Sequence, residues 1–298
     1  MRREEEDASD RIRLTRETAR SRVYCVFRQY YRGRPKAAGW LGLSTSLDRA
    51  FHAALPNSVL ARRPTHEAGD RRRRIVYLEY PAHYSVLLVG PPGAGKLEYA
   101  LELVRHYFGR DERVVFVTLD ISPDEIRERA RRLGLDLERH EGSEFVFVDC
   151  YSSNATDRFD TAVRKGTFTV SSFSNLEGIG MTISKAAHEL RPPVRILFYT
   201  VSTLFLHNSP QVIAKFIQII TSRVKSNTGF ILYAVHDGVH EPITMSLLQS
   251  LVDGVVEMRF NDAMEREIRV HHLRGVFVDP RWERFEPMAR IETALGGT

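Results

Sequence analysis

The sequence predicts an α/β protein with a mainly parallel sheet flanked by helices and with antiparallel strands near its C-terminal end. Short apolar runs of strand length alternate with segments whose apolar residues recur at helical spacing. One such run, Ser85–Val89, leads through a glycine-rich turn directly into a helical pattern. In contrast, residues alternate between apolar and polar in three later segments, Gly254–Phe260, Glu267–Leu273 and Trp282–Glu286. These later segments predict an antiparallel meander that continues the sheet.

Composition and charge divide the chain into two parts. The 298 residues are 43% hydrophobic, enough for the core of one α/β domain with an additional segment. Residues 1–80 carry 18 Lys+Arg against 10 Asp+Glu, whereas residues 81–298 carry 25 against 28. We therefore expect a basic segment over residues 1–74, helical or partly disordered, and a folded domain over residues 75–298. The basic segment is a candidate contact for nucleic acid, and a solvated Arg-rich tail explains it equally well.

The first residues and the cysteine content restrict the cellular context. Met1–Asp7 is charged and lacks the apolar core of a signal peptide, and no apolar run is long enough to cross a bilayer. Two cysteines, Cys25 and Cys150, are too few for a disulfide framework or a Cys-rich zinc site. We expect a cytoplasmic protein without membrane association, and reduced thiols.

The glycine-rich turn has the pattern Gly-x-x-x-x-Gly-Lys. Its glycines allow a tight turn whose N–H groups face inward. The following helix presents its positive N-terminal end to the same place, and Lys96 can reach the outer phosphates of a nucleotide. A hydroxyl residue that holds Mg²⁺ normally follows the lysine, and here Leu97 takes its place. The sequence predicts nucleotide binding and leaves Mg²⁺ open, and a tight turn with a surface lysine is the alternative. The predicted contact residues are Gly90, Pro91, Pro92, Gly93, Ala94, Gly95, Lys96, Leu97 and Glu98.

Strands and helices then follow in alternation. A capping box is predicted from Ser122, with Pro123 in the first turn and Glu125 at the reciprocal position. Ser209 and Pro210 are expected to begin a long amphipathic helix with Val212, Ile213, Phe216, Ile219, Ile220 and Val224 facing inward. The other expected helix covers residues 176–190, after a Ser- and Thr-rich stretch, residues 150–175. Expected strands cover residues 75–80, 85–89, 114–119, 145–149, 194–199 and 229–235.

The order of these motifs resembles the RecA superfamily, in particular the archaeal KaiC-like and GvpD-like ATPases. The resemblance covers roughly residues 76–290 and implies a P-loop RecA-like core, ATP as the ligand, and a homo-oligomer. The matching landmarks, besides the glycine-rich turn and its strand, are Phe116–Pro123, Phe147–Ser152, Arg195–Leu204, Leu251–Glu257 and Leu273–Gly275.

Several positions depart from the family pattern. Tyr199 takes the place of an Asp that helps to hold Mg²⁺, and Asp120–Ile121 takes the place of paired Glu residues, one of which polarises the attacking water. No metal ligand is therefore assigned, and Asp120 is the catalytic candidate, with capping of the next helix as its alternative. The resemblance makes His236 a candidate γ-phosphate sensor, and the alternative is a structural histidine held by hydrogen bonds. Arg274 resembles a basic residue that related oligomers place near the nucleotide of a neighbouring subunit, and the alternative is a surface arginine.

Together these features imply an ATP-binding RecA/KaiC-like protein with a regulatory or assembly role and weak or absent hydrolysis. Three alternatives stay open: a genuine ATPase that uses Asp120, a nucleic-acid-binding accessory of the recombinase type, and a pseudo-ATPase interaction scaffold. Fold alone does not decide among them.

Overall fold

The computed structural model describes residues 80–152, 165–172 and 174–287. All of them belong to the second of the two units into which the chain divides, Asp70–Thr298. The basic segment over residues 1–74 lies outside the described residues, and so does nearly all of the strand predicted over 75–80. The nucleic-acid contact therefore stays a prediction.

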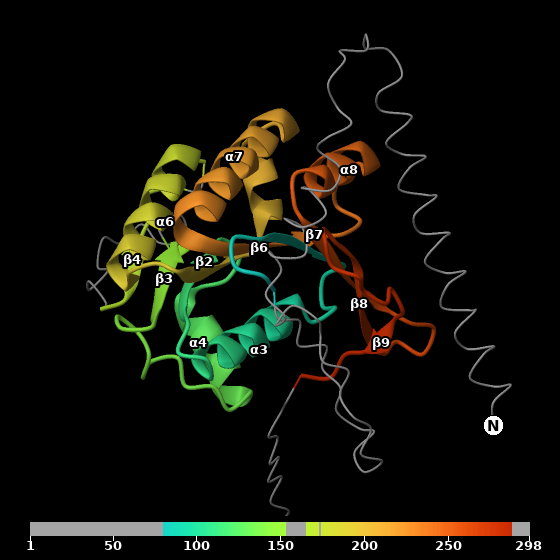
Figure 1. Cartoon of the computed structure of the whole chain (residues 1–298), viewed down its shortest axis with the longest axis horizontal. Coiled ribbons are helices and arrows are strands. Elements are labelled where there is room, and N and C mark those ends of the chain that lie inside the picture. Colours follow the sequence, from blue (N-terminus) through green and yellow to red (C-terminus); the bar gives the residue numbers. More distant parts are fainter. Residues whose placement is uncertain (1–79, 153–164, 173, 288–298) are drawn as a thin grey trace, which may run out of the picture. The chain divides into compact units, whose positions relative to one another are not determined.

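A sheet of nine strands forms the centre of the described region, in the order β4-β3-β2-β5-β6-β1-β7-β8-β9 (Figure 1). Neighbouring strands from β4 to β7 are parallel, and β8 and β9 are antiparallel to their neighbours. The predicted α/β class with antiparallel C-terminal strands is confirmed, and the arrangement is compatible with a RecA-like core. The strand bounds are β1 Ser85–Gly90, β2 Arg113–Thr118, β3 Phe145–Asp149, β4 Thr167–Thr169, β5 Val194–Tyr199, β6 Gly229–His236, β7 Gly254–Phe260, β8 Arg266–Leu273 and β9 Glu283–Arg284.

Strand β7 differs from the sequence-based prediction. It pairs in parallel with β1, from Val86 opposite Gly254 to Val89 opposite Glu257, and is antiparallel only toward β8. The reason is helix α8 (Pro242–Ser250), which the sequence analysis missed and which lies between β6 and β7. A crossover helix returns the chain to the starting edge of the sheet, so that the next strand runs parallel.

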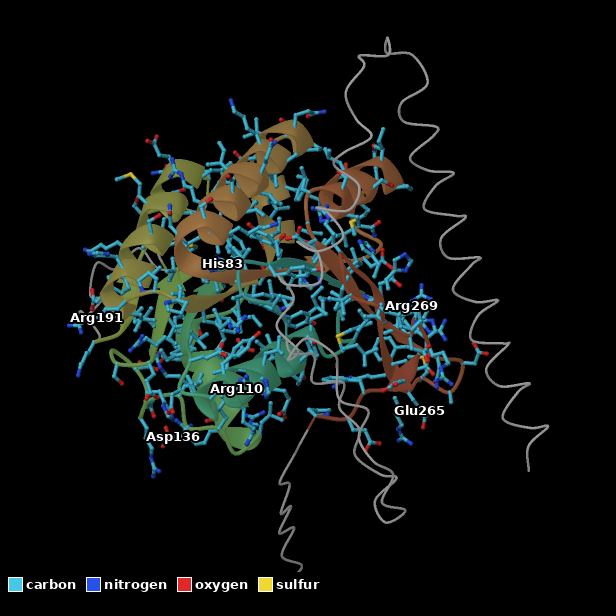
Figure 2. The ribbon with its side chains drawn as sticks, in the orientation of Figure 1. His83, Arg110, Asp136, Arg191, Glu265 and Arg269 are labelled. Atoms are coloured by element: carbon cyan, nitrogen blue, oxygen red, sulfur yellow. The ribbon has the colours of Figure 1, made fainter. Side chains whose placement is uncertain are left out.

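Helices cover both faces of the sheet. Figure 1 shows α3 (Lys96–Phe108) and α4 (Pro123–Arg132) on one face, and α6 (Leu176–Leu190), α7 (Pro210–Arg223) and α8 on the other. Each face has its own apolar core, because successive residues of a strand point to opposite sides. Charged side chains such as Arg191 and Asp136 lie at the periphery (Figure 2). None of the described helices is both long and apolar enough to cross a membrane.

At two helix starts the observed cap differs from the predicted one. The Ser122 hydroxyl accepts a hydrogen bond from the Glu125 amide at 3.2 Å, as predicted, while the Glu125 carboxylate pairs with Arg129 at 2.6 Å. Ser209 makes no side-chain cap at the start of α7.

The inward face of α7 was also predicted too broadly. Val212 and Ile219 are 48% and 41% exposed, whereas Ile217 is buried. The buried positions recur at intervals of three and four residues, and Val212 and Ile219 border that stripe on its outer side.

Candidate functional site

The glycine–lysine loop (Gly90–Lys96) connects the carboxyl end of β1 to the first turn of α3. Strand β1 lies between β6 and β7, near the middle of the sheet. Gly93 and Gly95 have φ values of 80° and 100°, a left-handed conformation that residues with a side chain rarely adopt. Gly95 is the residue that precedes the helix. In parallel sheets the carboxyl ends of the strands are where ligands bind, so the fold places the loop at the expected edge.

Lys96 is folded back onto this loop. Its Nζ donates hydrogen bonds to the carbonyl oxygens of Gly90 at 2.6 Å and Pro91 at 2.8 Å, and the residue is only 3% exposed. Burial lowers the pKa of Lys96 to about 8, and the nearby charges of Asp120, Asp237 and Glu98 oppose this decrease. Neutral carbonyl groups hold this buried cation. An anion in the loop would stabilise its charged form.

Asp120 lies just beyond the end of β2 and joins three strand ends. The Thr200 hydroxyl donates to Asp120 Oδ2 at 2.6 Å, the Thr203 hydroxyl donates to Oδ1, and His236 Nε2 lies 3.3 Å from Oδ2. Both carboxylate oxygens are therefore engaged. The hydroxyl that caps α4 belongs to Ser122, and the alternative that Asp120 is favoured by the dipole of that helix stays open. The catalytic role of Asp120 stays a prediction.

His236 lies at the end of β6, beside Asp120. Its backbone N–H donates to Ser202 Oγ at 2.9 Å, and His240 Nε2 lies 2.9 Å from the same oxygen. Burial, and then the neighbouring His236, lower the pKa of His240. Within the described ranges His236 Nδ1 is buried without a hydrogen-bond partner. The structure thus places His236 in a polar cluster next to the loop, and its role as a sensor stays a prediction.

The two positions that would normally serve Mg²⁺ are unsuited to it. Leu97 is 2% exposed in the apolar core and has no ligating atom. Tyr199 is 8% exposed, its ring centroid lies 6.4 Å from that of Phe116, and burial raises the pKa of its phenol. No group of three or more His, Cys, Asp or Glu side chains in the described part of the chain could hold a metal. The residues present do not fit the usual Mg²⁺ arrangement of a phosphate loop.

Three residues of the C-terminal region pack against the loop, and the sequence patterns did not predict them: Phe260 of β7, Arg266 of β8, and Phe285, which follows β9. A Cβ atom added at Gly95 would lie 2.8 Å from the Phe285 ring and 3.4 Å from Cδ of Arg266. A Cβ atom added at Gly93 would lie 3.8 Å from the Phe260 ring. These residues follow the loop by more than one hundred and sixty positions in the chain. Local patterns give no signal for such a contact.

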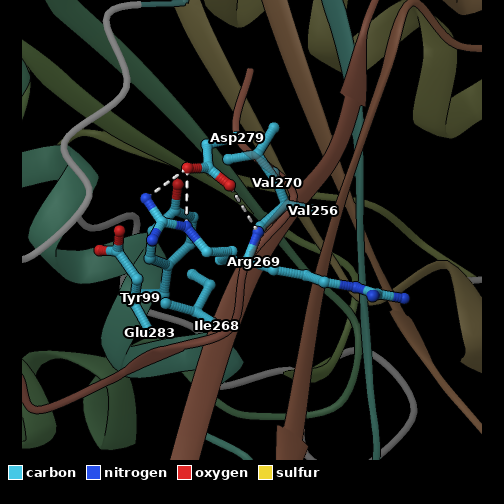
Figure 3. Close-up of a pocket in the computed structure, with 8 residues that line it drawn as sticks. Tyr99, Val256, Ile268, Arg269, Val270, Asp279 and Glu283 are labelled. Atoms are coloured by element: carbon cyan, nitrogen blue, oxygen red, sulfur yellow. Dashed lines mark hydrogen bonds and ion pairs between the residues drawn. The ribbon is translucent and has the colours of Figure 1, made fainter.

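A separate pocket lies between α3 and the C-terminal strands (Figure 3). Several of its polar groups are paired within the protein: Asp279 accepts from Arg281 Nε at 2.7 Å, and the Tyr99 hydroxyl lies 2.7 Å from that of Tyr80. Neither Lys96 nor the groups that act on it line this pocket, so we place the candidate site at the loop. The residues that line it are Tyr99, Val256, Ile268, Arg269, Val270, Asp279, Arg281 and Glu283.

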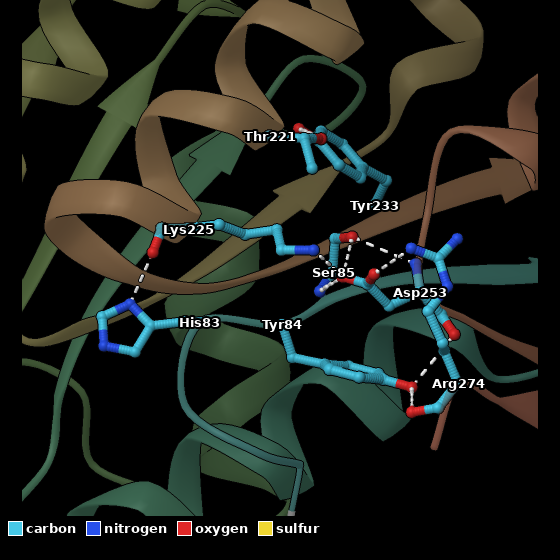
Figure 4. A network of polar contacts seen from close by, with 8 residues as sticks. All are labelled: His83, Tyr84, Ser85, Thr221, Lys225, Tyr233, Asp253 and Arg274. Carbon is cyan, nitrogen blue, oxygen red and sulfur yellow. Dashed lines mark hydrogen bonds and ion pairs between the residues drawn. The ribbon is translucent and has the colours of Figure 1, made fainter. Parts of the chain in front are cut away.

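Arg274 belongs to a different polar network, at the amino end of β1 (Figure 4). Its Nη1 donates to the buried carboxylate of Asp253 at 2.9 Å, and Ser85 Oγ donates to the same side chain at 2.8 Å. Burial raises the pKa of Asp253, but hydrogen bonds from Lys225 and Ser85 outweigh it and lower the pKa overall. Arg274 is thus engaged at the end of β1 opposite the loop, and its predicted role at a neighbour's nucleotide stays a prediction.

Fold and site together define an α/β protein with a Gly-x-x-x-x-Gly-Lys loop at the carboxyl end of a central parallel strand. The chain belongs to a family of unknown function, DUF7504, whose sequence pattern matches residues 84–258. It is also similar to a UPF0273 protein of Aeropyrum pernix, with 24% identity over 220 residues, which covers 71% of this chain and 85% of the relative. The family match spans the loop, Asp120, Tyr199 and His236, and it ends within β7.

Proposed function

We propose that this protein binds ATP, with the triphosphate on the glycine–lysine loop and the first turn of α3. The observation that carries the proposal is Lys96, a buried cation held by the Gly90 and Pro91 carbonyl groups at the carboxyl edge of the sheet. A phosphate bound in the loop would be stabilised by the positive N-terminal end of α3 and by the charge of Lys96. The order of motifs that resembles RecA/KaiC-like ATPases supports ATP as the nucleotide.

We further propose that hydrolysis is weak or absent and that the protein has a regulatory or assembly role. Phosphoryl transfer needs positive charge on the developing phosphate oxygens and a positioned group for the attacking water. Leu97 and Tyr199 supply neither metal ligand, and both oxygens of Asp120 already accept hydrogen bonds. Binding of the nucleotide depends on the loop and Lys96 and is less affected by these departures.

Thermal unfolding of the full chain with ATP, with and without Mg²⁺, tests the proposal when phosphate release is measured in parallel. Ligand at about one hundred times its Kd should raise the free energy of unfolding by about 2.7 kcal/mol. Stabilisation without phosphate release is the expected result. Stabilisation that needs Mg²⁺ and comes with release would show a genuine ATPase, and no stabilisation would favour an interaction scaffold.

A further inference from the structure

Arg266, the first residue of β8, lies at the glycine–lysine loop. Its Cδ lies 3.4 Å from the point where a Cβ atom on Gly95 would be, and Gly95 immediately precedes Lys96. In the sheet, Arg266 is the partner of Phe260, the last residue of β7. This end of β7 extends past Glu257, the last residue of β7 that pairs with β1. The stem of Arg266 therefore lies next to the loop, and its guanidinium lies near Glu98 in the first turn of α3.

Among the residues that the structure describes, the guanidinium of Arg266 makes a long contact with Glu98 and no closer one. Its Nη1 lies 3.8 Å from Oε1 of Glu98, and its side chain is 35% exposed. Other arginines of the same strands make closer contacts, such as 2.8 Å for Arg259 to Glu267 and 2.6 Å for Arg269 to Glu257. A contact of 3.8 Å is longer than a hydrogen bond, so the N–H groups of this guanidinium are available to another acceptor.

The site around the loop needs further positive charge to hold a triphosphate. The carboxylates of Asp120, Asp237 and Glu98 act on Lys96 from nearby, and they would repel a polyphosphate. Mg²⁺ usually neutralises this repulsion, and the positions that would hold it are Leu97 and Tyr199. Arginine is suited to the task, because its planar fork of N–H donors matches phosphate oxygens and stays charged at any ordinary pH.

We propose that Arg266 is a phosphate-binding residue of this site and that it supplies, from the same chain, positive charge that Mg²⁺ provides in related loops. Glu98 is its partner while the site is empty, and the guanidinium moves from Glu98 to the phosphates when nucleotide binds. ATP binding is then largely independent of Mg²⁺. This inference rests on the proposed nucleotide binding at the loop.

Calorimetric titration of the full chain with ATP, in EDTA and in Mg²⁺, tests the inference. Arg266→Gln keeps much of the side chain's stem and removes the charge, and it should weaken ATP binding in EDTA about tenfold to hundredfold. The matched control is Arg281→Gln, which removes the same charge from a side chain that is 83% exposed and paired with Asp279. Its Kd should stay within about twofold of the unaltered chain. Glu98→Gln removes a negative charge from beside the guanidinium and should tighten ATP binding in EDTA.

The outcomes separate this inference from the proposed function. An unaltered chain that fails to bind ATP refutes both. If it binds ATP, and Arg266→Gln and Arg281→Gln have equal affinities, the inference alone is refuted. A strict requirement for Mg²⁺ in the unaltered chain also refutes it. If circular dichroism shows that Arg266→Gln does not fold, Arg266→Lys replaces it. Lysine keeps the charge but lacks the planar fork of donors, so its Kd for ATP should exceed that of the unaltered chain by more than about twofold and by less than the change expected for Arg266→Gln.

Discussion

The affinity of the site for ATP should fall steeply as the pH rises through the titration of Lys96. Burial lowers the pKa of this lysine to about 8 in the empty protein, so its charge is lost within an accessible range. Bound phosphates favour the charged form and should raise the pKa of Lys96 well above its value in the empty protein. Nucleotide binding is then linked to proton uptake, and the sign of the pH dependence follows.

The size of the effect follows from the pKa of the empty site. Between about pH 7.5 and about pH 9.5 the charged fraction of a group with a pKa of about 8 falls from about three quarters to about 3%. If the bound lysine stays charged, Kd should rise about 25-fold over this range. Fluorescence or calorimetric titration of ATP at a series of pH values measures it. Calorimetry in two buffers of different ionisation enthalpy should also show the uptake of close to one proton near about pH 9.

A matched variant isolates the lysine from other groups. Lys96→Arg keeps its charge throughout this range, so any affinity that it retains should vary little with pH. A pH-independent Kd and no proton uptake in the unaltered chain would refute the reasoning, because Lys96 would then either make no ion pair with the ligand or stay charged in the empty protein over this pH range.

The empty protein offers a second measurement of the same group. The pKa of Lys96 is about 8 in the folded state and 10.5 in its usual state, so the unfolded chain binds more protons between these values. The free energy of unfolding should therefore rise with pH across this window, relative to Lys96→Met, by at most about 3 kcal/mol. Denaturant titrations at the two ends of the window measure the difference. Parallel curves for the two proteins would contradict the lowered pKa.

Three further substitutions have defined outcomes. Gly95→Ala places a Cβ atom 2.8 Å from the Phe285 ring at a φ of 100°. It should lower the free energy of unfolding by about 1–3 kcal/mol and abolish ATP binding. The control is Gly134→Ala, which is also at positive φ but in open space and should leave ATP binding intact. Asp120→Ala removes the acceptor of two threonine hydroxyls and should cost about 1–3 kcal/mol in urea unfolding; an unchanged midpoint would deny that it joins the strand ends. Leu97→Thr combined with Tyr199→Asp should raise Mg²⁺-dependent phosphate release, and no increase would mean that these positions do not limit hydrolysis.

The sequence was sufficient for the parts of the fold that local patterns determine. The strand–loop–helix around Gly90–Lys96 and the cap at Ser122 depend on residues within a few positions of one another. Helix α8 was not predicted because it is short, with nine residues, and its apolar residues do not form one stripe. Ile243 and Leu247 are exposed, whereas Met245 and Leu248 are buried. That omission also produced the wrong partner for β7.

The candidate site was predicted only in its local half. The loop residues were found, but the engagement of Asp120 with Thr200, Thr203 and His236 depends on how β2, β5 and β6 align. Arg266 and Phe285 approach Gly95 only because β8 and β9 fold back along β7. Contacts of this kind arise from sheet order, which sequence patterns alone do not determine.

Direct titration of ATP into the full chain and into Lys96→Ala tests the central claim most directly. The matched control is Lys215→Ala, which removes an exposed lysine of α7 away from the loop. We expect saturable binding by the unaltered chain and by Lys215→Ala, and no binding by Lys96→Ala, with all three proteins folded by circular dichroism. Equal affinity in Lys96→Ala and Lys215→Ala would remove the glycine–lysine loop from the account.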